Sequence, residues 1–123
     1  MLYIAVNYSA NKRFTTANNW INRAISKKPG YGKPYIVRGE LYESMVGACQ
    51  GSKTELEDKI VYEEAQKVYE MAKKDPVFIS TANTKIRNLN DYVRKPEEKF
   101  MEPNAKVVNP CYEFLVGKSG NSN

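Results

Sequence analysis

The sequence predicts an α+β fold, in which a small and mostly antiparallel sheet packs against about three to four helices. Short apolar segments of β-rich composition alternate with longer segments whose apolar residues follow helical spacing. With 123 residues and 41% hydrophobic residues, the chain is long enough and apolar enough to form one core. We therefore expect one compact α+β domain over residues 1–116, followed by a polar C-terminal tail over residues 117–123.

The expected strands are short. The opening segment alternates Leu2, Ile4 and Val6 with Tyr3 and Ala5, which is typical of a strand with one buried face. The remaining candidates are rich in β-branched and aromatic residues or lie next to a turn signal. They are residues 34–38 (PYIVR), residues 77–80 (VFIS) and two strands within residues 105–117 (AKVVNPCYEFLVG), on either side of an Asn-Pro turn.

The expected helices are longer. Residues 15–30 place Ala17, Trp20 and Ile21 on one apolar stripe and end at a Pro-Gly pair. A second helix is predicted over residues 39–51. A long helix near residues 53–74 is predicted after a capping-box sequence at 52–55, and a further helix over 81–96 ends at a proline.

The chain has no histidine and two distant cysteines. Without histidine, Ser-His-Asp and Cys-His nucleophile systems and the usual Cys/His zinc sites are excluded. Cys49 and Cys111 lie outside any CxxC pattern, so we expect small core residues and not a disulfide or a metal site. We expect no metal and no cofactor. The sequence favours a non-enzymatic role, and a histidine-free nuclease working through Tyr, Arg, Lys and Glu is the remaining enzymatic hypothesis.

The predicted location is the cytoplasm, of the host cell if a phage encodes the chain. No apolar run approaches the roughly 20 residues that span a bilayer, and the opening segment lacks a basic lead-in. No membrane partner is expected.

Charge is distributed unevenly. The net charge is +5, but residues 1–39 hold seven basic residues and no acid, whereas residues 40–75 hold nine acids and five lysines. Such asymmetry indicates a charged binding surface. The alternative is that the two regions neutralise each other in the fold. Glu57 and Glu64 on the long helix need partners if buried, and a basic partner from residues 1–39 would serve. A paired-carboxylate metal or acid–base site is the less favoured alternative.

The segment at residues 26–39 (SKKPGYGKPYIVRG) combines cations with tyrosines. It is no P-loop, because Pro34 follows Lys33 and the expected helix precedes the glycines. Its cations suit phosphate and its rings suit stacking on bases. A second basic cluster lies at residues 85–95. The candidate residues for phosphate or nucleic-acid binding are Arg23, Lys27, Lys28, Tyr31, Lys33, Tyr35, Arg38, Lys85, Arg87, Tyr92, Arg94 and Lys95.

Two hypotheses of function follow. The first is a small, basic, non-enzymatic binding protein whose partner carries phosphate, either a nucleic acid or a nucleotide-type ligand. The alternative is a small phage-type inhibitor that binds and blocks a host protein, such as a defence or nucleic-acid-processing factor. Self-association into a homo-oligomer stays open under both hypotheses.

Overall fold

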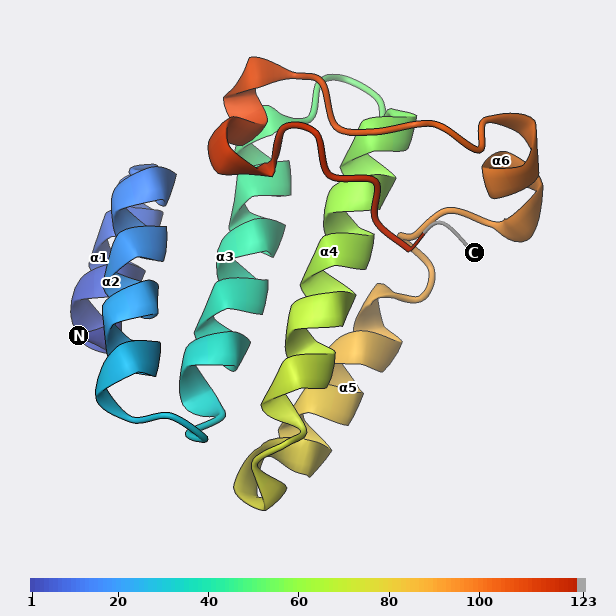
Figure 1. Cartoon of the computed structure of the whole chain (residues 1–123). Helices are drawn as coiled ribbons and strands as arrows, with labels where there is room; N and C mark the ends of the chain where they lie inside the picture. The colour runs from blue at the N-terminus through green and yellow to red at the C-terminus, as the bar shows by residue number, and fades with distance from the viewer. Residues whose placement is uncertain (122–123) are drawn as a thin grey trace.

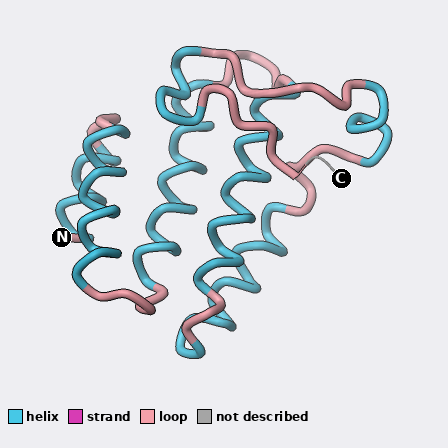
Figure 2. The backbone as a smooth tube through the Cα atoms, viewed as in Figure 1, coloured by secondary structure: helices cyan, strands magenta, loops and turns pink. Residues whose placement is uncertain are grey.

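The computed structural model describes residues 1–121, and every regular element in this range is helical (Figures 1 and 2). The expected antiparallel sheet, and with it the α+β class, is therefore wrong. The elements are α1 (Leu2–Ala10), α2 (Phe14–Lys27), α3 (Lys33–Cys49), α4 (Leu56–Ala72), α5 (Ile79–Leu89) and α6 (Pro96–Met101), with 3-10 turns η1 (Pro76–Phe78) and η2 (Pro110–Leu115).

The predicted strands are helical or irregular for identifiable reasons. The opening segment forms α1. A short alternation of apolar residues does not distinguish a strand from a helix that carries apolar residues on several sides. Residues 34–38 lie inside α3. There, Pro34 occupies the first turn, where a missing N–H costs no helical hydrogen bond. Residues 77–80 belong to η1 and α5. Residues 105–117 are irregular apart from η2. The side chain of Asn109 caps the start of η2, where its oxygen accepts a hydrogen bond from the N–H of Cys111 at 2.9 Å.

Two predicted helices are confirmed. Helix α2 ends at Lys27, just before the Pro-Gly pair, and buries Ala17 and Ile21 as the stripe indicated. The long helix is α4, although its start signal differs from the predicted one. The carboxylate of Asp58 accepts from the N–H of Glu55 at 2.8 Å and so satisfies a free donor at the helix start. Helix α5 ends at Leu89, well before the proline that was expected to end it.

The helices pack side by side around one core (Figure 1). Helix α2 packs against both α1 and α3, α3 against α4, and α4 against α5. Burial of each large apolar side chain contributes about 1.5–3 kcal/mol relative to exposure. The largest fully buried apolar residues are Ile21, Leu41, Met45, Ile60, Tyr69, Tyr112 and Leu115. Within residues 1–121, no helix combines the length and the apolar character needed to cross a bilayer.

Gly39 allows α3 to approach α4 closely. A Cβ at this position would lie 2.3 Å from the ring of Tyr69, which is fully buried and donates its hydroxyl hydrogen bond to Glu43. Because the ring is held in place, Gly39→Ala is expected to lower the free energy of unfolding by about 1–3 kcal/mol. Gly47→Ala in the same helix meets open space and should raise stability by about 0.5–1 kcal/mol. Urea denaturation of both variants tests this, and equal effects would contradict the close packing.

The irregular C-terminal segment is attached to α4 by polar side chains. The carboxylate of Glu57 accepts from the backbone N–H groups of Val108 at 3.1 Å and Asn109 at 2.8 Å. The carboxylate of Asp58 accepts from the buried hydroxyl of Tyr112. Burial of the Tyr112 hydroxyl and its bond to Asp58 raise the pKa of this phenol. Glu57 and Asp58 of α4 therefore anchor this segment.

A buried ion pair fixes the end of the chain. Arg94 donates to the two carboxylate oxygens of Glu63 at 2.8 and 2.7 Å, and both side chains are 1% exposed. Arg94 also donates to the carbonyl of Ser119 at 3.0 Å, and Glu63 accepts from the N–H of Asn121 at 2.8 Å. Ser119 and Asn121, which the sequence assigned to the polar tail, are thus held by Arg94 and by Glu63 of α4. Residues 122–123 of that tail lie outside the described residues.

Cys49 and Cys111 form a disulfide, with 5.7 Å between their Cα atoms. The prediction of two unpaired core cysteines is therefore wrong. The bond joins the end of α3 to η2 across a separation of 62 residues. Neither cysteine lies in a local motif, so only the return of the chain across the bundle brings the two together.

Candidate anion-binding surface

Four of the predicted binding residues lie together at one end of the bundle. Arg23 and Lys27 are on the last turns of α2, Lys28 follows in the turn, and Lys33 begins α3 (Figure 1). All four are exposed. We call these four residues the basic pole.

The acids of α4 do not neutralise the basic pole. Glu57 is bound to backbone N–H groups of the C-terminal segment, and Glu64 pairs with Lys67 of its own helix at 3.0 Å. The sequence correctly indicated that these carboxylates need partners, but those partners do not come from residues 1–39. Within residues 1–121, none of the four basic-pole side chains forms an ion pair. Their charge is therefore available to a ligand.

Aromatic rings support two of these cations. The guanidinium of Arg23 lies 4.3 Å from the ring centroid of Trp20, and the ammonium of Lys28 lies 4.5 Å from that of Tyr31. Tyr31 also packs edge-on against Phe78, with centroids 5.7 Å apart. Such cation–π contacts orient the charge at the surface. Because Lys28 and Phe78 both contact the ring of Tyr31, this ring is less open to base stacking than the sequence indicated.

Beside these contacts, α2 carries an open hollow of about 340 Å³ lined by Asn22, Arg23, Ser26 and Lys27. Arg38 of α3 reaches the rim, donating to Asn22 and, at 3.0 Å, to Asn18. Burial lowers the pKa of Arg38. An arginine guanidinium nevertheless stays charged at neutral pH in proteins. With its oxygen bound to Arg38, Asn22 keeps its amide N–H groups for a ligand. Two cations, an amide and a hydroxyl together suit a carboxylate or a phosphate group.

The remaining predicted tyrosine of the first segment has a different environment. Tyr35, on α3, is half-buried and packs against the hydrophobic core. It belongs to the helix packing and not to the hollow.

The second basic cluster is dispersed. Lys85 of α5 is paired with Glu40 of α3, their nitrogen and oxygen atoms 2.7 Å apart. Arg87 is exposed on α5 and donates to the hydroxyl of Thr84 at 3.3 Å. These two residues therefore have local partners and lie on a different helix from the basic pole.

Two further members of the second cluster, Arg94 and Tyr92, pack within the fold. Arg94 is buried against Glu63, so a ligand has no access to its guanidinium. The ring of Tyr92 packs against Tyr62, with centroids 5.5 Å apart. Lys95 is exposed at the start of α6. The groove with basic walls from both clusters, which the sequence suggested, is not assembled by these residues.

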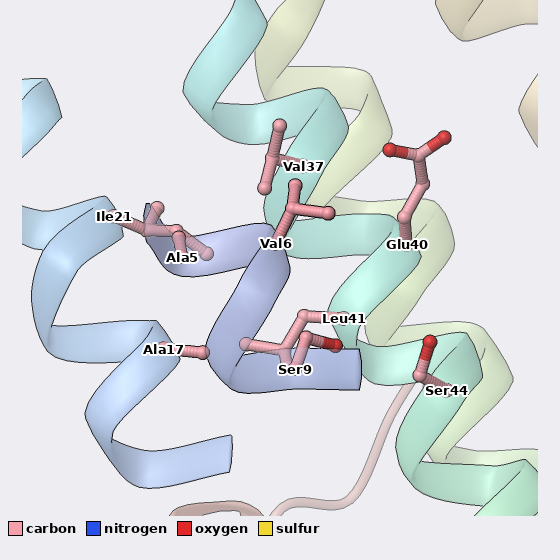
Figure 3. A pocket seen from close by; sticks show the side chains of 9 residues that line it. All are labelled: Ala5, Val6, Ser9, Ala17, Ile21, Val37, Glu40, Leu41 and Ser44. Carbon is pink, nitrogen blue, oxygen red and sulfur yellow. The ribbon is translucent and has the colours of Figure 1, made fainter. Parts of the chain in front are cut away.

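A cavity of about 110 Å³ lies between α1, α2 and α3 (Figure 3). Apolar side chains such as Ile21 and Leu41 line it, together with Ser9, Ser44 and Glu40. Ligand pockets for drug-sized molecules are typically about 300–1,000 Å³, so this cavity is too small for a nucleotide. It therefore offers no place for the nucleotide-type ligand of the first hypothesis.

Sequence reasoning did not include Asn22 and Ser26 among the binding residues. The signal was present, since both lie on the face of α2 opposite the apolar stripe, which carries no acid. The exposed cations and these polar residues together form one candidate surface for an anion, on α2 and the adjoining turn. Comparison of the chain with protein-family models, curated proteins and solved structures finds no match.

Proposed function

We propose that the chain is a non-enzymatic binding protein whose basic pole binds an acidic surface on a partner protein, as a small inhibitor would. The observation that carries this proposal is the exposure of four clustered cations that have no ion pair within residues 1–121. Clustered uncompensated charge accelerates encounter with a partner of opposite charge and selects against partners of the same charge.

The disulfide supports a protein partner. Structural disulfides persist in oxidising compartments and are rare in the reducing cytoplasm. The expected cytoplasmic location was inferred from the opening segment of the sequence, whereas the Cys49–Cys111 bond is more typical of an oxidising compartment. We therefore propose an oxidising compartment for the protein, and a protein partner fits that location better than an intracellular nucleic acid does.

Nucleic-acid binding is the second candidate. It is favoured by the run of 39 residues without an acid and by the ability of lysine to contact phosphate without stacking. The partial occupation of Tyr31 and the packing of Tyr35 weaken this reading, because stacking on aromatic rings contributes much of the affinity for single strands.

Charge reversal at the basic pole tests the proposal. The triple variant Arg23→Glu, Lys27→Glu, Lys33→Glu should bind a fluorescent poly-glutamate peptide at least about tenfold more weakly, a change of roughly 1.4 kcal/mol. Fluorescence anisotropy at low salt measures this affinity. The matched control reverses three exposed lysines elsewhere, Lys53, Lys106 and Lys118, and changes the net charge equally.

The same titrations separate the two candidates. Equal losses in the triple variant and its control would mean that only net charge matters, which contradicts a specific surface. Tighter binding of single-stranded DNA or RNA than of poly-glutamate, lost only in the triple variant, would favour the second candidate. In the cells that express the protein, affinity enrichment after nuclease treatment should recover a stoichiometric acidic protein with the wild type and not with the triple variant.

A further inference from the structure

A second hollowed surface lies where α6 stands beside the start of α4. Two adjoining hollows, of about 470 and 410 Å³, share Leu56 and Glu102. The first is also lined by Glu97 and Met101 of α6, and the second by Val108 of the irregular segment. We call these five residues the acidic groove. Figure 1 shows α6 projecting from the bundle, away from the α2–α3 turn that bears the basic pole.

The walls of the acidic groove are held in place. Glu98 of α6 pairs with Lys59 of α4 at 2.7 Å and accepts from the N–H of Lys95 at 2.9 Å. The hydrogen bond from Lys59 and these other contacts hold the pKa of Glu98 below its ordinary value. The buried Arg94–Glu63 pair fixes the chain just before α6. A partner would therefore meet a preformed groove, which lowers the entropy cost of binding.

The groove and its rim expose large apolar side chains. Met101 is 75% exposed and Val108 is 60% exposed, and Phe100, the residue before Met101 in α6, is 84% exposed. A group of large exposed apolar side chains is typical of an interaction surface, whereas apolar residues that are exposed singly are common on any protein. Methionine adapts its shape to irregular partners, which suits a docking surface.

The charge of the groove is negative. Glu97 and Glu102 are exposed, and neither forms an ion pair within residues 1–121. Glu57 and Glu98 add negative charge at the walls of the groove. Lys59, which pairs with Glu98, and Lys106 offset part of this charge. An occupant that matches this surface must bring apolar side chains and an excess of positive charge.

We propose that the acidic groove binds a basic amphipathic helix of a partner protein. Such a helix places apolar anchors at three- and four-residue spacing on one face and lysines or arginines at its edges. The anchors would cover Leu56, Met101 and Val108, and the edges would meet Glu97 and Glu102. This site is separate from the basic pole, so either can fail without the other.

A synthetic amphipathic peptide of leucine and lysine tests the proposal, measured by isothermal titration calorimetry against a leucine–glutamate peptide of equal length. Glu97→Lys with Glu102→Lys should weaken binding of the leucine–lysine peptide by at least about tenfold. Met101→Ser, which leaves the charge unchanged, should also weaken it. The control pair Glu70→Lys with Asp91→Lys makes the same charge change at exposed positions elsewhere and should have little effect.

Two outcomes would overturn the proposal. The first is an equal loss of affinity in the Glu97/Glu102 pair and the Glu70/Asp91 pair, or no loss with Met101→Ser, because binding would then be governed by net charge alone. The second is self-association of the free protein in sedimentation velocity, lost both with Glu97→Lys plus Glu102→Lys and with Lys27→Glu. That result would identify the basic pole of a second copy as the occupant.

Discussion

Replacing both cysteines with serine is expected to lower the free energy of unfolding by about 4 kcal/mol, because the unfolded chain regains the entropy of an open loop. The Cys49–Cys111 bond closes a long loop, with a sequence separation of 62 residues. For a loop of this length the loss is a large part of the typical stability of a domain, about 5–15 kcal/mol.

The position of the bond adds to the expected effect. It attaches η2 to the end of α3, and Glu113 of η2 accepts from the N–H of Thr15 at 3.2 Å, at the start of α2. Urea denaturation of the Cys49→Ser, Cys111→Ser variant measures the loss. Reductant should destabilise the wild type to a similar degree and leave the variant unchanged. A wild type that is insensitive to reductant at every urea concentration would contradict the disulfide.

Arg94→Ala is expected to lower the free energy of unfolding by about 3–5 kcal/mol, since it leaves Glu63 as an unpaired buried carboxylate. The mutation also removes the donors to the carbonyl groups of Ser119 and Asn121, at 3.0 and 3.4 Å. The matched control is Arg87→Ala, at an exposed arginine of α5, which should change stability by no more than about 0.5 kcal/mol. Similar losses in the two variants would contradict a structural role for the buried pair.

The ion pair also predicts how stability depends on pH. Burial alone would raise the pKa of Glu63, but hydrogen bonds from the Arg94 side chain and from the N–H groups of Arg94 and Asn121 outweigh it and hold this pKa below its ordinary value of 4.5. Because the folded pKa is the lower one, the contribution of Glu63 is fully present above the unfolded pKa and is lost as the pH falls through the folded pKa. In Arg94→Ala the Arg94 side-chain donors are lost, so burial should raise the pKa of Glu63 above its ordinary value. The stability difference between the wild type and Arg94→Ala should therefore narrow as the pH falls from above 4.5 through the lowered folded pKa of the wild type.

The helices that could be predicted from the sequence are those with a long apolar stripe. Helix α2 combines such a stripe with a Pro-Gly stop, and α4 is too long for a strand. Residues 34–38 could not be assigned correctly, because a proline before a β-rich stretch suits both the edge of a strand and the first turn of a helix. The path of residues 102–121 could not be predicted either, since it depends on hydrogen bonds to side chains of α4 such as Glu57 and Glu63.

The candidate site shows the same division. The exposure of Lys27 and Lys33 at a helix end and a helix start follows from their place beside turn residues, and the structure keeps both in solvent. Arg87 is exposed and Arg94 is buried, although both belong to one basic cluster in the sequence. Arg94 is buried because Glu63, 31 residues earlier, provides a partner in α4. No local pattern around Arg94 contains that information.

Mapping the bound surface by NMR is the most direct test of the central claim, that the basic pole is the anion-binding surface. Amide chemical shifts would be followed while poly-glutamate is added to the wild type. The largest changes are expected at residues 22–33, covering the end of α2 and the turn into α3, and they should vanish in the Arg23→Glu, Lys27→Glu, Lys33→Glu variant. Changes centred on Lys53, Lys106 or Lys118, or spread evenly over the surface, would contradict the claim.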